Sequence, residues 1–163
     1  MGDGLRPRPA GDRKIRVLTV VDTFSRFSPI IDPRFSYRAE NVVQALERIC
    51  RNIGYPKTIR VDQGSEFVSR DMDLWAYAKG VTLDFSRPGK PTDNAFIEAF
   101  NGRFRAECLN EHWFLSLDDA RSKMEDRIQR EPASHGSWQY PAQRIRFAGS
   151  RFDSLKGSNA VRN

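Results

Sequence analysis

Apolar positions follow strand-like and helix-like patterns along the middle of the chain. The β-branched run Ile15–Val21 predicts a buried strand. Residues 26–31 predict a second strand, for which Pro29 favours an edge position or a bulge. Apolar spacing and capping residues then predict a helix over 36–52, a strand over 58–61, a helix over 69–79, a strand over 81–85, and helices over 93–109 and 116–130. Strands alternating with helices favour a layered α/β domain.

The two ends of the chain lack these patterns. Residues 1–14 hold two prolines and no strand or helix period, and the helical spacing fails at Glu131-Pro132. We therefore expect an irregular N-terminal segment over 1–14, one core domain over 15–130, and an irregular or disordered C-terminal tail over 131–163.

Composition places the chain among ordinary soluble proteins. Of its 163 residues, 39% are hydrophobic and 29% are charged. No apolar run approaches the roughly 20 residues of a membrane-spanning helix, and the first residues include no apolar stretch typical of a signal peptide. We expect a cytoplasmic protein with no membrane partner, whose Cys50 and Cys108 are reduced thiols.

The formal net charge of +6 lies wholly at the two ends. Residues 1–16 and residues 131–163 carry +3 each, whereas residues 17–130 balance 17 basic against 17 acidic side chains. The middle therefore has the charge balance of an ordinary globular surface. Charge alone does not indicate a nucleic-acid-binding protein.

Two acidic residues stand out by their positions in the predicted elements. Asp62 directly follows the strand over 58–61, and ligands of open α/β sheets tend to bind at the carboxyl ends of strands. Glu98 lies one turn into a partly apolar helix. Two carboxylates brought together repel each other unless a cation lies between them, and Mg²⁺ or Mn²⁺ prefers such oxygen ligands. The alternative is an aspartate that shapes a turn and a glutamate on a solvated helix face; Glu66 is either a second acid near Asp62 or a solvated loop acid.

Three stretches of this sequence carry a family resemblance: VLTVVDTFSR, GYPKTIRVDQGSEF and RPGKPTDNAFIEAFNGRFRAECLN. Over residues 16–130 the chain resembles the integrase core of the DDE transposases, specifically the OrfB-type transposases of insertion-sequence family three. That family has thirty-five residues between its second catalytic aspartate and its glutamate, and the same number separates Asp62 from Glu98. The family also has a basic residue seven positions after the glutamate, a place that Arg105 fills.

The resemblance implies an RNase H-like integrase core, a mixed sheet flanked by helices, and phosphoryl transfer on DNA with two Mg²⁺ or Mn²⁺ ions. By resemblance, Asp62 and Glu98 are the catalytic carboxylates. Asp62 is then a ligand of one metal ion and Glu98 a ligand of the other. Arg105 is expected to contact a phosphate, and Lys90 and Asn94 are expected to approach the DNA. The implied partners are the DNA of the transposon ends and target, and a second copy of the chain or an intact transposase.

The chain also departs from the family pattern. The family's first catalytic aspartate belongs to a central first strand, in a motif like Trp-x-x-Asp-Phe, and this sequence has no such strand ahead of VLTVVD. Asp22 matches the turn after the family's second strand, where we expect a structural role. The family's closing Arg-Pro-His…Leu-Gly…Pro signature is missing too. We therefore expect a sheet that lacks its first central strand, with unpaired backbone groups beside the gap, and impaired catalysis.

Both losses have one interpretation at the level of codons. Residues 1–13 can be encoded so that the frame one base later reads Trp-Ala-Met-Asp-Phe, which is very like the missing first-strand motif. Residues 136–148 can be encoded so that the next frame reads Leu-Gly-Asn-Ile-Pro-Pro, which resembles the missing C-terminal signature. The hypothesis is a truncated or frameshifted transposase that is in frame only through its middle.

Three functions stay open from the sequence. The first is an active DDE recombinase, which needs a third carboxylate to hold both metal ions. The second is a non-catalytic remnant of the integrase core that binds DNA or an intact transposase. The third is a two-carboxylate hydrolase such as a glycosidase, which needs no metal.

Overall fold

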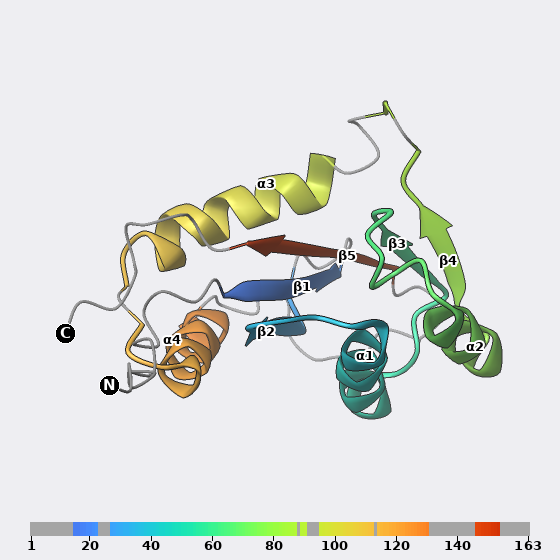
Figure 1. The fold of residues 1–163 in the computed structure, drawn as a ribbon, viewed down its shortest axis with the longest axis horizontal. Coiled ribbons are helices and arrows are strands. Elements are labelled where there is room, and N and C mark those ends of the chain that lie inside the picture. The colour runs from blue at the N-terminus through green and yellow to red at the C-terminus, as the bar shows by residue number, and fades with distance from the viewer. Residues whose placement is uncertain are drawn as a thin grey trace, which may run out of the picture.

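The computed structural model describes residues 15–22, 27–87, 89–90, 95–112, 114–130 and 146–153. Its strands are β1 (Arg16–Asp22), β2 (Ile30–Arg34), β3 (Thr58–Val61), β4 (Thr82–Phe85) and β5 (Arg146–Asp153). Its helices are α1 (Ala39–Ile53), α2 (Arg70–Lys79), α3 (Ala95–Phe104) and α4 (Leu117–Arg130), and a π-helical turn, η3 (Arg105–Leu109), continues α3. These strands form one mixed sheet in the order β2-β1-β5-β3-β4, flanked by the helices (Figure 1).

β1 contributes to cores on both faces of the sheet, because alternate side chains of a strand point to opposite faces. Leu18 and Val20 pack with side chains of α1 and α2. Val17 packs with side chains of η3 and α4, and Val21 packs with Ile97 of α3. All four β1 side chains are at most 1% exposed. The sheet is therefore a middle layer, with α1 and α2 on one face and α3 and α4 on the other.

β5 forms the centre of the sheet. It runs antiparallel to β1, from Arg16 paired with Asp153 to Asp22 paired with Phe147, and parallel to β3. The expectation of an irregular tail over 131–163 is therefore wrong for residues 146–153, which form a strand. The expectation of unpaired backbone groups beside a central gap is also wrong, because this strand fills the gap. The sequence RFAGSRFD has no clean apolar alternation and an internal glycine, so its own pattern does not predict a strand. Pairing on both sides satisfies the backbone groups of β1 and β3 that a gap would leave unpaired.

The other elements lie close to their predicted ranges, with two shifts. β3 coincides with the predicted strand, and α2 begins after Ser69, whose Oγ accepts a hydrogen bond from Met72 N at 3.2 Å. α1 begins at Ala39 rather than near Ser36. β2 begins at Ile30, four residues later than predicted. Within the described ranges, every helix is too short or too polar to cross a membrane.

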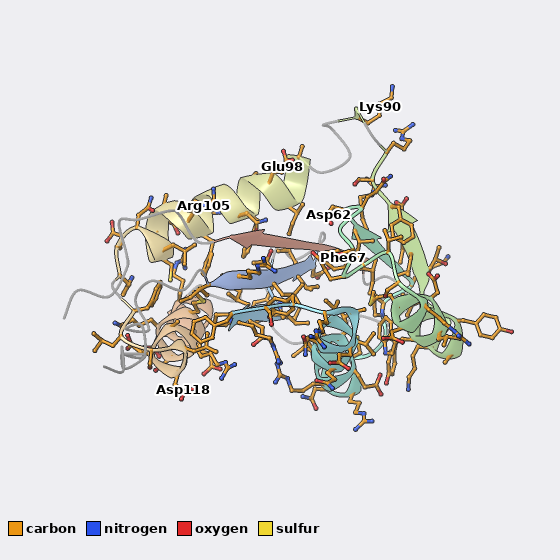
Figure 2. All side chains as sticks on the ribbon, in the orientation of Figure 1. Asp62, Phe67, Lys90, Glu98, Arg105 and Asp118 are labelled. Carbon is orange, nitrogen blue, oxygen red and sulfur yellow. The ribbon has the colours of Figure 1, made fainter. Side chains whose placement is uncertain are left out.

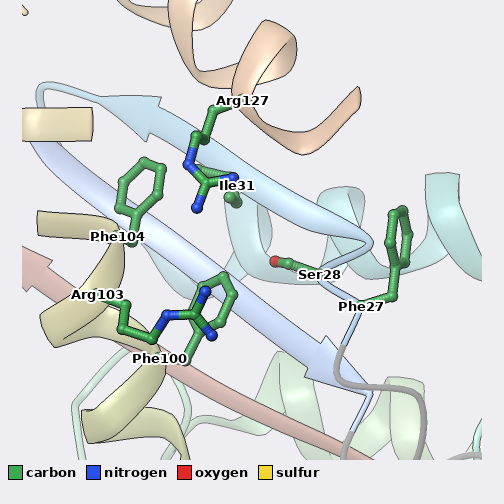
Figure 3. A pocket seen from close by; sticks show the side chains of 7 residues that line it. All are labelled: Phe27, Ser28, Ile31, Phe100, Arg103, Phe104 and Arg127. Atoms are coloured by element: carbon green, nitrogen blue, oxygen red, sulfur yellow. The ribbon is translucent and has the colours of Figure 1, made fainter. Parts of the chain in front are cut away.

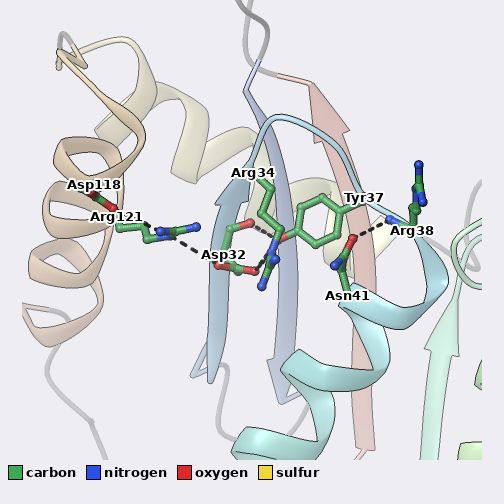
Figure 4. A network of polar contacts seen from close by, with 7 residues as sticks. All are labelled: Asp32, Arg34, Tyr37, Arg38, Asn41, Asp118 and Arg121. Atoms are coloured by element: carbon green, nitrogen blue, oxygen red, sulfur yellow. Dashed lines mark hydrogen bonds and ion pairs between the residues drawn. The ribbon is translucent and has the colours of Figure 1, made fainter. Parts of the chain in front are cut away.

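A polar network fixes the edge strand β2 (Figure 4). Asp32 Oδ2 accepts hydrogen bonds from Tyr37 OH at 2.6 Å and from Arg34 Nε at 2.8 Å, and Asp32 Oδ1 lies 3.9 Å from Arg121 of α4. Burial and the bond to Asp32 raise the pKa of Tyr37 far above its ordinary value. Because Asp32 is only 7% exposed, these partners compensate the cost of burying its charge.

Glu47 joins α1 to α2. Its carboxylate accepts hydrogen bonds from Trp75 Nε1 at 2.9 Å and from Tyr55 OH at 3.0 Å, and it pairs with Lys79 Nζ at 3.2 Å. The bond from Trp75 is the largest of several causes that lower the pKa of Glu47 to about 2. The charged carboxylate of Glu47 therefore links α1 to α2.

Candidate active site

The turn after β3 holds Asp62 in place. Val61 is buried at the end of the strand, and the half-buried Asp62 follows it. The backbone N–H of Gly64 donates a hydrogen bond to Asp62 Oδ1 at 2.8 Å, which is the geometry of an Asx turn. Gln63 Nε2 donates to the carbonyl oxygen of Ser86 at 3.1 Å and ties the turn to the end of β4. The carboxylate of Asp62 is thus fixed at the carboxyl end of β3.

Two carboxylates enclose Gly64. A Cβ atom built on Gly64 would lie 2.7 Å from Glu66 Oε1 and 2.9 Å from Asp62 Oδ1. Both oxygens are close to one point, so they lie less than about 6 Å apart. Glu66 is only 3% exposed. Of the two readings of Glu66 that the sequence left open, the structure supports the acid beside Asp62.

Glu98 lies on the first turn of α3, which is fixed to β1 by buried contacts. Thr19 Oγ1 donates a hydrogen bond to Asn101 Oδ1 at 2.7 Å, and Ile97 packs on Val21. The side chain of Glu98 is exposed. In the view of Figure 2, Glu98 lies at the end of α3 nearer to β3 and Asp62. The two contacts with β1 therefore hold α3, the helix of Glu98, in a defined position on the sheet.

Sequence reasoning did not single out Asn101. A weak signal was available, because Asn101 is a polar residue in a helix stretch rich in phenylalanine, three positions after Glu98. Residues at that spacing lie on neighbouring positions of a helix surface. Its buried side chain, 9% exposed, sets the position of α3 on β1.

The residues expected to contact DNA lie apart from one another. Arg105 is half-buried at the start of η3, and Lys90 is exposed beyond β4. Figure 2 shows Lys90 above the sheet and Arg105 at the far end of α3 from Glu98. Asn94 lies outside the described residues. The structure therefore groups Asp62 with Glu66, but of the expected DNA contacts that it describes, Lys90 and Arg105 lie apart.

A separate crevice lies between the start of β2, α3 and α4 (Figure 3). Its lining is three phenylalanines, one isoleucine, one serine and two arginines: Phe27, Ser28, Ile31, Phe100, Arg103, Phe104 and Arg127. None of these is a carboxylate or a residue of the β3–α2 turn. The crevice is therefore not part of the candidate site.

The carboxylates at the β3–α2 turn are suited to a hard cation but do not complete its coordination. Mg²⁺ prefers an octahedral shell of oxygen ligands. In the ranges that the structure describes, no three or more His, Cys, Asp or Glu side chains gather to hold a metal ion. The residues present thus do not fit the two-metal site that the family resemblance implies.

Comparisons of the sequence with known proteins point to one family. The integrase core domain matches residues 2–91, and a second integrase core domain description matches residues 79–130. The uncharacterized 31.7 kDa protein of insertion element IS407 from Burkholderia multivorans is 53% identical over 110 residues, which cover 68% of this chain and 40% of that protein. The uncharacterized 39.2 kDa protein of insertion element IS476 from Xanthomonas euvesicatoria is 45% identical over 117 residues, which cover 72% of this chain and 34% of that protein. The chain thus spans well under half the length of these curated relatives.

The fold has a counterpart among solved structures. The catalytic core domain of HTLV-2 integrase, solved in complex with magnesium in a trimeric form, matches with a TM-score of 0.55 and 21% sequence identity. The match covers 75% of this chain and 82% of that chain. It confirms the predicted mixed α/β fold of the RNase H-like type.

Proposed function

The chain belongs to the integrase core domain family, and on that premise we propose that it acts in DNA transposition as the core of an insertion-element transposase whose cation site is incomplete. Family membership favours DNA over a sugar as the substrate, which argues against a two-carboxylate glycosidase. We place the protein in the cytoplasm. Its proposed partners are DNA and either a second copy of the chain or an intact transposase.

The β3–α2 turn is the observation that carries this proposal. It fixes Asp62 through the N–H of Gly64 and keeps the buried carboxylate of Glu66 beside it. Asp62 and Glu98 are the proposed cation-binding carboxylates, and Lys90, Asn94 and Arg105 are the proposed phosphate contacts. Because the carboxylates of the described residues do not complete a metal site, we assign no strand-transfer step to this chain alone.

The first test measures cation binding by the purified chain. We expect Mn²⁺ at millimolar concentration to raise the melting temperature slightly, because a ligand that binds only the native state stabilises it. Asp62→Asn and Glu98→Gln should each reduce this rise. Asp118→Asn is the matched control, because the side chain of Asp118 is 92% exposed on α4 and lies far from Asp62 in Figure 2. An Mn²⁺ effect that survives both site substitutions would refute the assigned carboxylates.

The second test concerns DNA. The chain should bind double-stranded DNA with an affinity that falls as salt rises, because phosphate contacts release counterions. Arg105→Gln should weaken binding without regard to DNA sequence. We expect no strand transfer by the chain alone. Magnesium-dependent strand transfer that Glu98→Gln abolishes would show that the site is complete after all.

The reading-frame hypothesis is part of the same proposal. If the gene has lost its frame, its DNA read one base later should encode Trp-Ala-Met-Asp-Phe across residues 1–13 and Leu-Gly-Asn-Ile-Pro-Pro across residues 136–148. Sequencing the gene with its flanks and translating every frame decides the matter. Neighbouring frames without these motifs would refute the frameshift and leave the core assignment intact.

A further inference from the structure

The backbone register of β5 identifies one position beside Asp62. β5 runs parallel to β3, and the last residue of β3, Val61, is paired with Gly149. Asp62 and Ser150 are each one residue further along. Position 150 is therefore the position of the central strand that is in register with Asp62.

The pairing with β1 fixes the face of the sheet to which position 150 belongs. Ser150 is paired with Thr19, and directly paired residues of neighbouring strands share a face. Thr19 donates its hydroxyl hydrogen bond to Asn101 of α3, so this is the face that α3 covers. The same helix carries Glu98 on its first turn. Position 150 thus belongs to the face of α3 and neighbours Asp62 in register.

The alternation of β3 assigns Asp62 to that face as well. Ile59 and Val61 pack into the core with α1 and α2, whereas Arg60 between them is exposed. Continued by one residue, the alternation directs position 62 away from α1 and α2. Positions 62 and 150 thus share the face of the sheet that α3, the helix of Glu98, covers.

From this register we propose that position 150 is the third ligand position of the cation site, and that its serine leaves the site incomplete. The inference rests on the proposed function, since it takes Asp62 and Glu98 as cation ligands. A carboxylate there would add the charge that a divalent cation needs, because affinity rises with the number of charged oxygen ligands. Without a cation the same carboxylate would repel that of Asp62.

The test is Ser150→Asp, with Mn²⁺ binding measured by calorimetry and by the shift in melting temperature. We expect Mn²⁺ to bind at least about tenfold more tightly than to the unmodified chain. Without metal, we expect the substituted chain to melt at a lower temperature than the unmodified chain, because the new carboxylate is then uncompensated. Asp62→Asn in the same chain should cancel the gain, since the two carboxylates would share one ion.

Two controls separate the ligand position from a change in size or charge. Ser150→Asn has the shape of the test substitution without its charge and should bind Mn²⁺ no better than the unmodified chain. Ser116→Asp adds the same charge at the start of α4, where Ser116 Oγ accepts a hydrogen bond from Asp119 N and where aspartate caps a helix as well as serine does. This second control should leave Mn²⁺ affinity unchanged.

The outcomes of this test and of the proposed function can be told apart. If Asp62→Asn lowers Mn²⁺ binding but a folded Ser150→Asp chain gains none, the third position is refuted and the proposed function stands. If neither substitution changes Mn²⁺ binding, both fail. A gain that persists with Asp62→Asn would show that position 150 binds the ion elsewhere, and this also refutes the inference.

A disulfide test of the register applies if Ser150→Asp does not fold. Arg16→Cys combined with Asp153→Cys joins two directly paired positions of β1 and β5, whose Cα separation in an antiparallel pair suits a disulfide. Arg16→Cys combined with Arg151→Cys is two residues out of register and should not form the bond. The native thiols interfere little, because Cys50 and Cys108 are buried and burial raises the pKa of both. Equal oxidation of the two pairs would overturn the register on which the inference depends.

Discussion

Gly64 sets how closely the carboxylates of Asp62 and Glu66 approach each other. The closest neighbour of an added Cβ would be Glu66 Oε1 at 2.7 Å, the mobile end of a side chain that is itself buried. The backbone of Gly64 does not need the left-handed conformation, because among the described residues the glycines with positive φ are Gly54, Gly80 and Gly89. The atoms nearest to an added Cβ therefore belong to the two carboxylates.

Gly64→Ala should consequently damage cation binding more than stability. We expect the free energy of unfolding without metal to fall by about 1–2 kcal/mol, which is typical of modest overpacking. The Mn²⁺-induced rise in melting temperature should be lost, because Asp62 Oδ1 must move. Thermal unfolding with and without Mn²⁺ measures both effects. An alanine variant that keeps the full Mn²⁺ effect would show that the ion does not need this geometry.

At this scale the sequence indicates candidate residues but not their neighbours in the fold. Asp62 could be singled out because it follows a buried strand, and Glu98 because it lies in a partly apolar helix and, by the family resemblance, because of its spacing from Asp62. The buried bond between Thr19 and Asn101 could not, because it joins residues 82 positions apart. The burial of Glu66 likewise depends on how the turn folds under Asp62, which no local pattern specifies.

Between elements, the charged form of Glu47 links α1 to α2, so this link depends on pH. Its pKa of about 2 in the folded protein lies below the value of about 4.3 expected for an unfolded chain. A carboxylate with a lowered pKa contributes stability above the unfolded pKa, and that contribution is lost as the pH falls towards the folded pKa.

Glu47→Gln should therefore lower the melting temperature most above about pH 5, and the difference from the unmodified chain should shrink as the pH falls towards 2. Melting curves followed by circular dichroism from pH 7 to pH 2 provide the measurement. Glu125→Gln, on the exposed surface of α4, is the matched control and should show little pH-dependent difference. A deficit for Glu47→Gln that stays constant over the whole range would mean that the charge of Glu47 is unimportant.

Most helices and strands could be predicted from local signals. Ser69 and Gly80 bound α2 as expected, because a side-chain cap and a left-handed glycine at φ 67° act within one turn of the helix. Ser36 failed as the start of α1, where the structure instead uses Arg38 and a backbone bond to Asn41 Oδ1. β5 could not be predicted, because both of its partner strands are distant in sequence and supply the pairing that its own residues do not favour.

For the whole molecule, β5 holds two halves of the sheet together. β2 and β1 pair with each other on one side of it, and β3 and β4 pair with each other on the other side. Deleting residues 146–163 should therefore abolish the single cooperative thermal transition, because two open sheet edges would remain. Deleting only residues 154–163, which leaves β5 in place, is the control and should retain the transition. A cooperative transition in the shorter chain would show that the two halves fold without β5.

The position of β5 in the chain also governs folding during synthesis. About 120 residues separate the central strand from β1, its neighbour in the sheet. At about 5–20 residues per second, roughly 5–20 s pass between completion of β3 and completion of β5 on a ribosome. Through that interval β1 and β3 present unsatisfied edges that strands of other nascent chains can join. Chaperone supply and the rate of translation, rather than equilibrium stability alone, should therefore set how much of this protein reaches its native sheet.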